Sequence, residues 1–310
     1  MFLKQKHLKV TELFHRKIVP ETILSSKRTE TLKKLWYTYS KNKSAVFGLI
    51  LLMLIILSTI FAPFITPYPS HVGAVVDFEN AGKPPSFKHF FGTDLAGRDI
   101  FTRVIFGYRF SLLMGVVVLS ISLPIGITLG LVAGYYKDSW VDTLFMRITD
   151  TILAIPPLLM ALAISAVLPT SLFYAMIAVT FAYWPYHARL IYGMSKQISS
   201  ESFILAAESI GARKFHIIFK EILPNCIGAV FTKITIDMGL VILMGAVLSF
   251  VGLGVQPPKP GLGTMIADGS KFLPGVWWIT LFPALAIVLV VYAFNLVGDG
   301  LAEAMAAQEM

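Results

Sequence analysis

ESFILAAESIGARKFHIIFKEILPN, residues 201–225, is a charged and amphipathic stretch between two long apolar parts of the chain. It contains two runs in which apolar residues recur at the i, i+3, i+4 and i+7 spacing of an amphipathic helix. Gly211 lies between the runs and can adopt the left-handed backbone that ends a helix, whereas Pro224 disfavours helical geometry in the residue before it. The stretch therefore predicts two short helices joined by a glycine turn, the second of them ending at Pro224. Their apolar stripes are Phe203, Ala206, Ala207 and Ile210, followed by Phe215, Ile218, Phe219 and Ile222.

The composition of the whole chain is that of an integral membrane protein. Of the 310 residues, 56% are hydrophobic and only 14% are charged, whereas a soluble domain has about 25% charged residues. The net charge of +8 comes mainly from Lys and Arg that precede the first apolar run. Such a basic segment resists translocation and stays in the cytoplasm. We therefore interpret it as a topology signal and not as a surface that binds nucleic acid.

Six apolar segments are each long enough to cross about 30 Å of hydrocarbon as a helix. With a cytoplasmic N-terminus, six crossings return the C-terminus to the cytoplasm and place residues 201–225 there as well. The apolar stripes of that stretch must then be covered by the rest of the chain, by the lipid interface or by another protein. The expected spans are about residues 44–65, 110–136, 151–167, 172–188 and 234–253, and a last one that ends near 297.

These spans predict how the chain is organised on both sides of the membrane. Asp99 and Arg103 share one face of an expected interfacial helix at i, i+4, so we interpret Asp94 and Asp99 as a helix cap and part of a surface ion pair, not as a catalytic carboxylate pair. The expected parts are a basic cytoplasmic tail (1–43), the first span (44–65), an extracytoplasmic loop with the interfacial helix (66–109), a core of five spans (110–300) that contains the amphipathic loop at about 196–230, and a cytoplasmic tail (301–310).

Prolines, small residues and tryptophans add detail to the expected bundle. Pro156 with Pro157, and Pro185, are expected to kink the third and fourth spans. Glycine and serine recur through the second span, which lets neighbouring helices approach closely. Trp277 and Trp278 match an aromatic anchor at the membrane interface.

The motifs of common enzyme and metal sites are missing from the sequence. It contains no G-x-x-x-x-G-K-[ST] phosphate loop, no H-E-x-x-H zinc pair and no G-x-S-x-G nucleophile elbow. Its single cysteine, Cys226, excludes an intrachain disulfide and leaves no cysteine cluster for a metal. We therefore expect neither catalytic residues nor a metal site in this chain.

A transporter driven by an ion gradient is the weaker alternative. Such a carrier needs acids or bases buried within its spans, because protons or Na⁺ must bind there. Asp150, Asp237 and Asp299 all fall at the ends of the expected spans. If the chain moves a solute, its energy is expected to enter from outside the chain, through the exposed stretch at residues 201–225.

Residues 201–225 resemble the EAA loop of the permease subunits of bacterial ABC importers, specifically the dipeptide/oligopeptide (and nickel) permease C type. The loop has the pattern E-A-A, three residues, Gly, nine residues, I-x-L-P, and Leu205 and Glu221 here occupy its Glu and Ile positions. The resemblance extends from about Phe91 to Leu301, through stretches such as GTDLAGRDIF and LAIPPLLMAL. The residues in register are Ala206, Ala207, Gly211, Leu223 and Pro224.

This resemblance implies a five-span core with one additional N-terminal span, in the bacterial inner membrane. It also implies a homologous second permease subunit, two cytoplasmic ABC ATPases that bind ATP and Mg²⁺, and an extracytoplasmic substrate-binding protein, so that no cofactor belongs to this chain. The expected substrate is a di- or oligopeptide, with nickel or another small solute as the alternative, and the residues that would line a substrate path stay unassigned. The expected ATPase-coupling residues are Glu201, Ala206, Ala207, Glu208, Gly211, Ala212, Phe215, Leu223 and Pro224.

Overall fold

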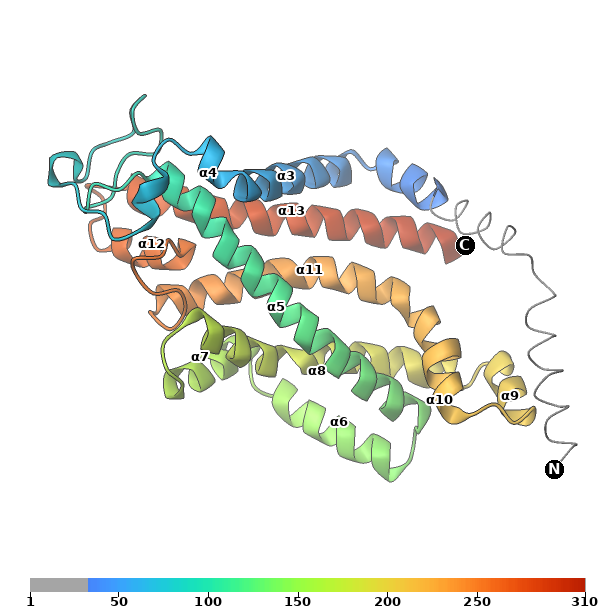
Figure 1. Cartoon of the computed structure of the whole chain (residues 1–310). Helices are drawn as coiled ribbons and strands as arrows, with labels where there is room; N and C mark the ends of the chain where they lie inside the picture. Colours follow the sequence, from blue (N-terminus) through green and yellow to red (C-terminus); the bar gives the residue numbers. More distant parts are fainter. Residues whose placement is uncertain (1–32, 310) are drawn as a thin grey trace, which may run out of the picture.

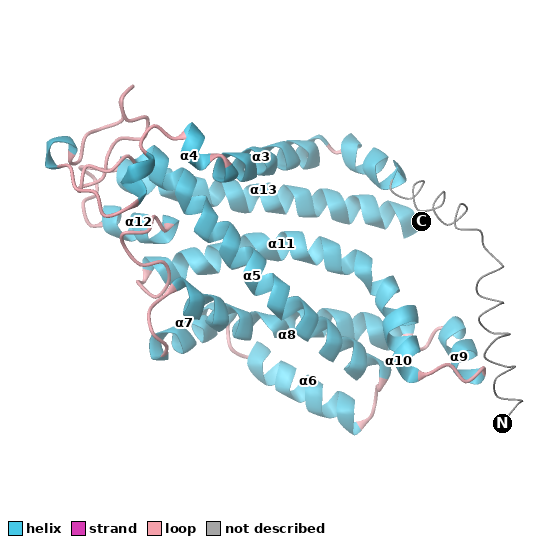
Figure 2. Cartoon of the chain, in the orientation of Figure 1, coloured by secondary structure: helices cyan, strands magenta, loops and turns pink. Residues whose placement is uncertain are grey.

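The computed structural model describes residues 33–309, whose regular structure is helical (Figure 1, Figure 2). Helix α3 lies beside α13 and α13 beside α11, while α5 crosses the bundle obliquely and packs along α8 (Figure 1). The elements are α3 (Lys43–Ile60), α4 (Ala62–Ile65), η1 (Pro69–Val72), η2 (Phe78–Asn80), α5 (Ile100–Tyr135), α6 (Trp140–Leu153), α7 (Pro157–Val167), α8 (Leu172–Ile198), α9 (Ser202–Ser209), α10 (Lys214–His216), the π-helical turn η3 (Ile217–Ile222), α11 (Leu223–Phe250), α12 (Leu262–Ser270) and α13 (Trp278–Glu309).

Four helices among the described residues are long and apolar enough to cross a membrane. The pair α6 and α7, bent by 84° at its break, makes a fifth if it counts as one broken span. Helix α8 has 27 residues but is not apolar enough to join this set, because residues such as His187, Arg189 and Lys196 lower its mean hydropathy. The described part of the chain is thus an all-helical membrane protein with four or five candidate spans. The four single helices are Lys43–Ile60, Ile100–Tyr135, Lys214–Phe250 and Trp278–Ala307.

The predicted interfacial helix does not exist as a separate element, because α5 runs without interruption from Ile100 to Tyr135. Ile100, Val104 and Tyr108, which an interfacial helix would turn toward the membrane surface, are buried in the main apolar core. Residues 100–109 are therefore the first turns of α5. Their apolar face is covered by protein and not by lipid headgroups.

The third predicted span is broken at the expected prolines. Helix α6 occupies mostly residues that lay between the second and third expected spans, and α7 begins at Pro157 after the 84° bend. The predicted kink at Pro156 and Pro157 is confirmed, since proline removes a backbone donor and crowds the preceding turn. Helix α8 continues through Pro185.

Close packing at glycines joins α5 to α8. A Cβ atom added at Gly126 would lie 2.6 Å from Cβ of His187, and one at Gly130 would lie 2.5 Å from the carbonyl oxygen of Ala188. Neither position can hold a larger side chain without moving α8 away. Small residues in α5 therefore bring the two backbones together, as the sequence predicted for the second span.

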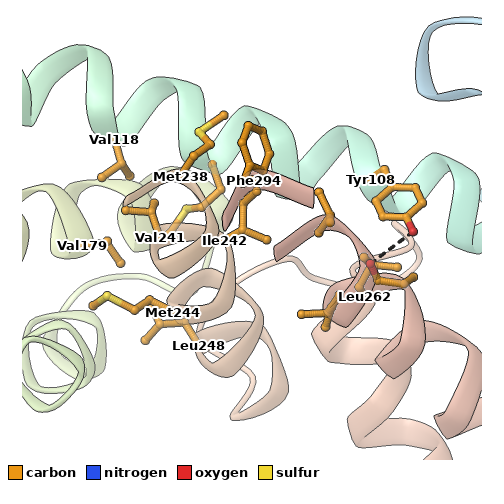
Figure 3. Packing of buried hydrophobic residues seen from close by; sticks show 14 of the residues in the cluster. Tyr108, Val118, Val179, Met238, Val241, Ile242, Met244, Leu248, Leu262 and Phe294 are labelled. Atoms are coloured by element: carbon orange, nitrogen blue, oxygen red, sulfur yellow. Dashed lines mark hydrogen bonds between the residues drawn. The ribbon is translucent and has the colours of Figure 1, made fainter. Parts of the chain in front are cut away.

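The main core lies where α5, α8, α11 and α13 meet (Figure 3). Val118, Val179 and Val241 point toward one another from three of these helices (Figure 3). A hydrogen bond of 3.2 Å from the Tyr108 hydroxyl to the carbonyl oxygen of Ala286 ties α5 to α13. These contacts hold the long helices as one body.

Helical structure extends into the described parts of both expected tails. Residues 33–41 are helical and precede α3, while the rest of the predicted N-terminal tail, residues 1–32, lies outside the described residues. At the other end α13 continues to Glu309, so the predicted C-terminal tail extends the last helix. Tyr39 packs with Ala45 and Ala304, which brings the segment before α3 against the end of α13.

Candidate functional site

The segment between α8 and α11, residues 199–222, contains the predicted helix, glycine turn and helix. We call it the α8–α11 loop. Helix α9 ends in a turn at Gly211, whose φ of +81° lies in the left-handed region. The N–H of Gly211 donates to the carbonyl oxygen of Glu208 at 2.9 Å, and that of Ala212 donates to Ala207 at 3.0 Å. The predicted glycine turn is confirmed, and a side chain at position 211 would strain this backbone.

The second predicted helix does not end at Pro224. Helices α10, η3 and α11 form one continuous helical stretch, Lys214–Phe250. The N–H of Leu223 bonds to the carbonyl oxygen of Ile218, five residues earlier. This π turn directly precedes Pro224, and its wider ring of atoms accommodates a residue that would otherwise clash with the carbonyl four positions before it. The α8–α11 loop is therefore joined rigidly to α11.

Four isoleucines attach the α8–α11 loop to the bundle. Ile204 of α9 and Ile217, Ile218 and Ile222 of η3 are buried. They form a second apolar cluster with Leu131 of α5, and with Ile191 of α8 and Cys226 of α11. Ile218 and Ile222 belong to the predicted stripe of the second helix, whereas in the first helix Ile204 is buried and not the predicted stripe.

The α8–α11 loop also has large apolar side chains that the described part of the chain leaves exposed. Ile210 is 85% exposed and Phe215 is 73% exposed. Phe203 and Leu205 are also about half exposed on α9. Burying a large apolar side chain is worth about 1.5–3 kcal/mol, so this surface favours contact with another molecule.

Polar contacts link the loop to the end of α5. The Tyr135 hydroxyl donates to Oε1 of Glu208 at 2.7 Å, and Nζ of Lys137 donates to Oγ of Ser200 at 2.6 Å. A groove of about 740 Å³ lies between these residues, with Leu205 also on its wall. Sequence reasoning missed Tyr135 and Lys137, because they lie more than sixty residues from the loop and carry no motif.

The nine predicted coupling residues all lie in or beside the α8–α11 loop. The side chain of Glu201 makes no capping hydrogen bond to α9, whereas Glu208 is held by Tyr135. Those that are exposed are Glu201, Ala206, Glu208, Gly211, Phe215 and Pro224, and those that are half-buried are Ala207, Ala212 and Leu223.

At the opposite end of the bundle, residues 66–99 form a second polar centre, and we call them the cap segment. Asp99 is fully buried and caps α5 by accepting from the Thr102 N–H at 2.7 Å, as predicted. Its other carboxylate oxygen lies 2.9 Å from Nδ1 of His89. The N–H of Asp99 donates to Nδ1 of His71 at 2.9 Å, so two distant histidines meet at this aspartate.

The predicted surface ion pair between Asp99 and Arg103 is wrong. Arg103 is buried, lies 3.6 Å from Asp94 and donates to the carbonyl oxygens of His71 and Pro258. The pair does not form because the cap segment folds over the start of α5 and gives each charge another partner. Trp278 is likewise buried and donates to the carbonyl oxygen of Thr93 at 3.1 Å, so it holds the cap segment and is not an interfacial anchor.

Asp237 lies at the middle of a helix, whereas the sequence placed it close to the start of the fifth expected span. Helix α11 begins at Leu223 and not near residue 234, so Asp237 falls at its middle. The carboxylate is fully buried and accepts from Tyr183 and Lys233. Among residues 33–309, no group of three or more His, Cys, Asp or Glu side chains is placed to hold a metal ion.

Comparison with known families assigns the chain. Residues 126–308 match the family "Binding-protein-dependent transport system inner membrane component". The chain belongs to this family. Residues 31–85 match a second family, "N-terminal TM domain of oligopeptide transport permease C". The protein is therefore a multi-pass permease component of the inner membrane and not itself an ATPase, and such a component works with an ATPase and a binding protein.

Individual relatives agree with this assignment. The chain is 43% identical to a dipeptide transport system permease protein of Alkalihalophilus pseudofirmus over 86% of each chain. It is 38% identical to an oligopeptide transport system permease protein of Bacillus subtilis over 91% of each. Among solved structures, an inward-facing methionine ABC transporter matches with a TM-score of 0.56 and 19% identity, over 66% of this chain and 97% of that one. The last match supports the permease fold alone.

Proposed function

We propose that this chain is the C-type permease subunit of an ABC importer that moves di- or oligopeptides into the cell. The relatives described above transport dipeptides and oligopeptides according to their names. The observation that carries the proposal is the α8–α11 loop, which isoleucines attach to the bundle and which exposes Ile210 and Phe215. Such a surface suits a cytoplasmic ATPase whose hydrolysis cycle has to move the membrane helices.

The proposed topology has six spans with both termini in the cytoplasm. They are α3, α5, the bent pair α6 and α7, α8, α11 and α13. The 27 residues of α8 would extend about 40 Å at 1.5 Å per residue, and its polar side chains face protein where they are buried. Lys196, Arg213, Lys214 and Lys220 lie on or next to the α8–α11 loop, which favours a cytoplasmic location for it. The cap segment is then extracytoplasmic.

The proposed assembly contains a homologous second permease subunit, two ATPases and an extracytoplasmic binding protein. ATP and Mg²⁺ would be bound by the ATPases. The nine coupling residues named above would form the contact, with Glu201 and Glu208 as the acids available near the Glu position that Leu205 occupies. Movement of the loop would pass to α5 and α8 through Leu131 and Ile191, which pack against its isoleucines. A rigid-body displacement of this kind is a common way to switch between two states of a packed bundle.

Uptake by cells tests the proposed substrate. A strain that lacks this chain is expected to lose uptake of labelled di- or oligopeptides and to regain it when the intact gene is supplied. Nickel uptake is measured in the same strains. Unchanged peptide uptake together with lost nickel uptake would overturn the peptide assignment, and uptake by the purified chain without ATPases would overturn the ABC assignment.

A further inference from the structure

A buried polar cluster joins the two helices that flank the α8–α11 loop. Tyr183 and His187 lie one turn apart on α8, and Lys233 and Asp237 lie one turn apart on α11. The Tyr183 hydroxyl donates to Oδ1 of Asp237 at 2.7 Å, and Nζ of Lys233 donates to the same oxygen at 2.6 Å. Tyr183, His187 and Asp237 are each at most 3% exposed. The cluster thus joins one turn of α8 to one turn of α11.

One side of this cluster has no hydrogen bond within the described residues. Oδ2 of Asp237 and both ring nitrogens of His187 are buried without a partner. Nδ1 of His187 lies 3.6 Å from that same Oδ2, whereas a hydrogen bond between nitrogen and oxygen is about 2.9 Å long. A shift of about 0.7 Å between α8 and α11 would therefore create a new bond.

Stability alone does not explain these polar groups. A buried ion pair is often no more stabilising than apolar side chains of similar volume, and a buried polar atom without a partner costs free energy. The same helices already meet through apolar residues, among them Val179 and Val241 (Figure 3). The polar groups add a directional constraint on how the two helices pack, because a hydrogen bond has few allowed geometries. Such a bond can also exchange one partner for another in a discrete step.

We propose that these four residues form a two-position contact that positions α8 against α11 during transport. In the arrangement seen here Tyr183 and Lys233 hold Oδ1 of Asp237. In the second arrangement His187 donates its Nδ1 proton to Oδ2, while Lys233 keeps the charge of Asp237 neutralised. The α8–α11 loop connects α8 to α11 along the chain. A force on that loop therefore shifts the position of α8 relative to α11. Tyr183 and His187 are positioning residues in this inference, which rests on the proposed function.

Transport by the assembled complex in lipid vesicles tests the contact. His187→Leu and Tyr183→Phe are each expected to lower the peptide moved per ATP hydrolysed at least tenfold, while basal ATP hydrolysis stays within twofold. His187→Gln is expected to keep more than half of the wild-type ratio, because its amide can donate to the same oxygen. Thr180→Val is the matched control, since Thr180 lies one turn before Tyr183 on α8 and its hydroxyl donates to Met176 of the same helix. Its ratio should be unchanged.

Two outcomes of this assay would overturn the inference. One is a wild-type ratio in His187→Leu. The other is a parallel loss of complex assembly, hydrolysis and transport in His187→Leu, which would make His187 a packing residue.

A spectroscopic test separates this inference from the substrate assignment. In complex labelled with ¹⁵N-histidine, the signals that vanish in His187→Leu belong to His187. They are expected to show a hydrogen-bonded Nδ1 in only one of two states, the nucleotide-free complex and the complex trapped with a non-hydrolysable ATP analogue. Identical His187 signals in both states would overturn the contact even if peptide uptake is confirmed. Failure of peptide uptake alone leaves this measurement readable.

Discussion

The cap segment and the α8–α11 loop occupy opposite ends of the same bundle (Figure 1) and are held in different ways. The cap segment is fastened by largely buried polar contacts that join Asp99 to His71, His89 and Thr102. The α8–α11 loop is fastened by isoleucine side chains and by a few hydrogen bonds at its surface. Both regions also expose aromatic side chains, so exposure by itself does not distinguish them.

The difference lies in what each kind of contact can transmit. Buried charged hydrogen bonds whose partners are all within bonding distance, such as those of Asp99, hold one geometry, and losing one partner leaves the other uncompensated. Apolar contacts are less directional and tolerate small shifts of a packed element. The polar contacts of the cap segment thus hold it in one shape, whereas the apolar contacts of the α8–α11 loop attach it to the bundle and still allow it to move. Four predictions test this contrast.

The largest effect is expected when the centre of the cap segment is removed. Asp99→Ala deletes the cap of α5 and leaves His89 without its buried partner, which should lower the free energy of unfolding by about 3–5 kcal/mol. Glu79→Ala, at an exposed position of the same segment, is the control and should change it by less than about 0.5 kcal/mol. Denaturant unfolding in detergent measures both. Equal effects would show that Asp99 does not hold the cap segment.

Gly211→Val is expected to strain the turn of the α8–α11 loop by about 2 kcal/mol, because position 211 has positive φ. The variant should still insert in the membrane but lose peptide uptake and co-purification of the ATPases. Gly193→Ala is the control: no atom of residues 33–309 lies within 4 Å of a Cβ added at either glycine, but Gly193 is in the regular helix α8. That change should be neutral or stabilising by up to about 1 kcal/mol. Normal uptake by Gly211→Val would contradict the role of the turn.

Ile210→Glu should leave the fold intact and weaken ATPase binding about tenfold, which corresponds to about 1.4 kcal/mol. The side chain is exposed in the isolated chain, so a charge there costs little until a partner covers it. Phe87→Glu is the matched control in the cap segment, where Phe87 is 100% exposed. Co-purification of the ATPases at increasing detergent wash measures both variants. A loss with Phe87→Glu equal to that with Ile210→Glu would show that the effect is not specific to the loop.

The smallest expected effect is a pH dependence of the cap segment. Burial lowers the pKa of His71 from its usual value, and its Nδ1 accepts from the N–H of Asp99. The unfolded chain therefore binds a proton more readily, at a usual histidine pKa of about 6.5, and stability falls as the pH drops from 7.5 toward 5. Thermal unfolding across this range should show a shallower slope in His71→Gln. An unchanged slope would remove His71 as the cause.

Much of the helical pattern could be predicted because it is local. The glycine turn at residue 211 and the break at Pro156 and Pro157 follow from the conformational limits of single residues. The errors came where distant segments meet. Arg103 exchanges its expected partner Asp99 for Asp94 and Pro258, and Pro224 stays within a helix because a π turn precedes it.

The amino-acid sequence is enough to identify a helical membrane protein, and the pattern at residues 201–225 marks the loop that we propose receives the ATPase. Hydropathy and residue spacing carry this information, since they act over a few turns of one helix. The folded structure was needed to show which face of that loop is buried and that Tyr135 and Lys137 border it. It was also needed to show that Asp237 lies at mid-helix beside Tyr183 and His187. These relations depend on how whole helices pack, and no short stretch of sequence encodes the position of a residue fifty or more places away.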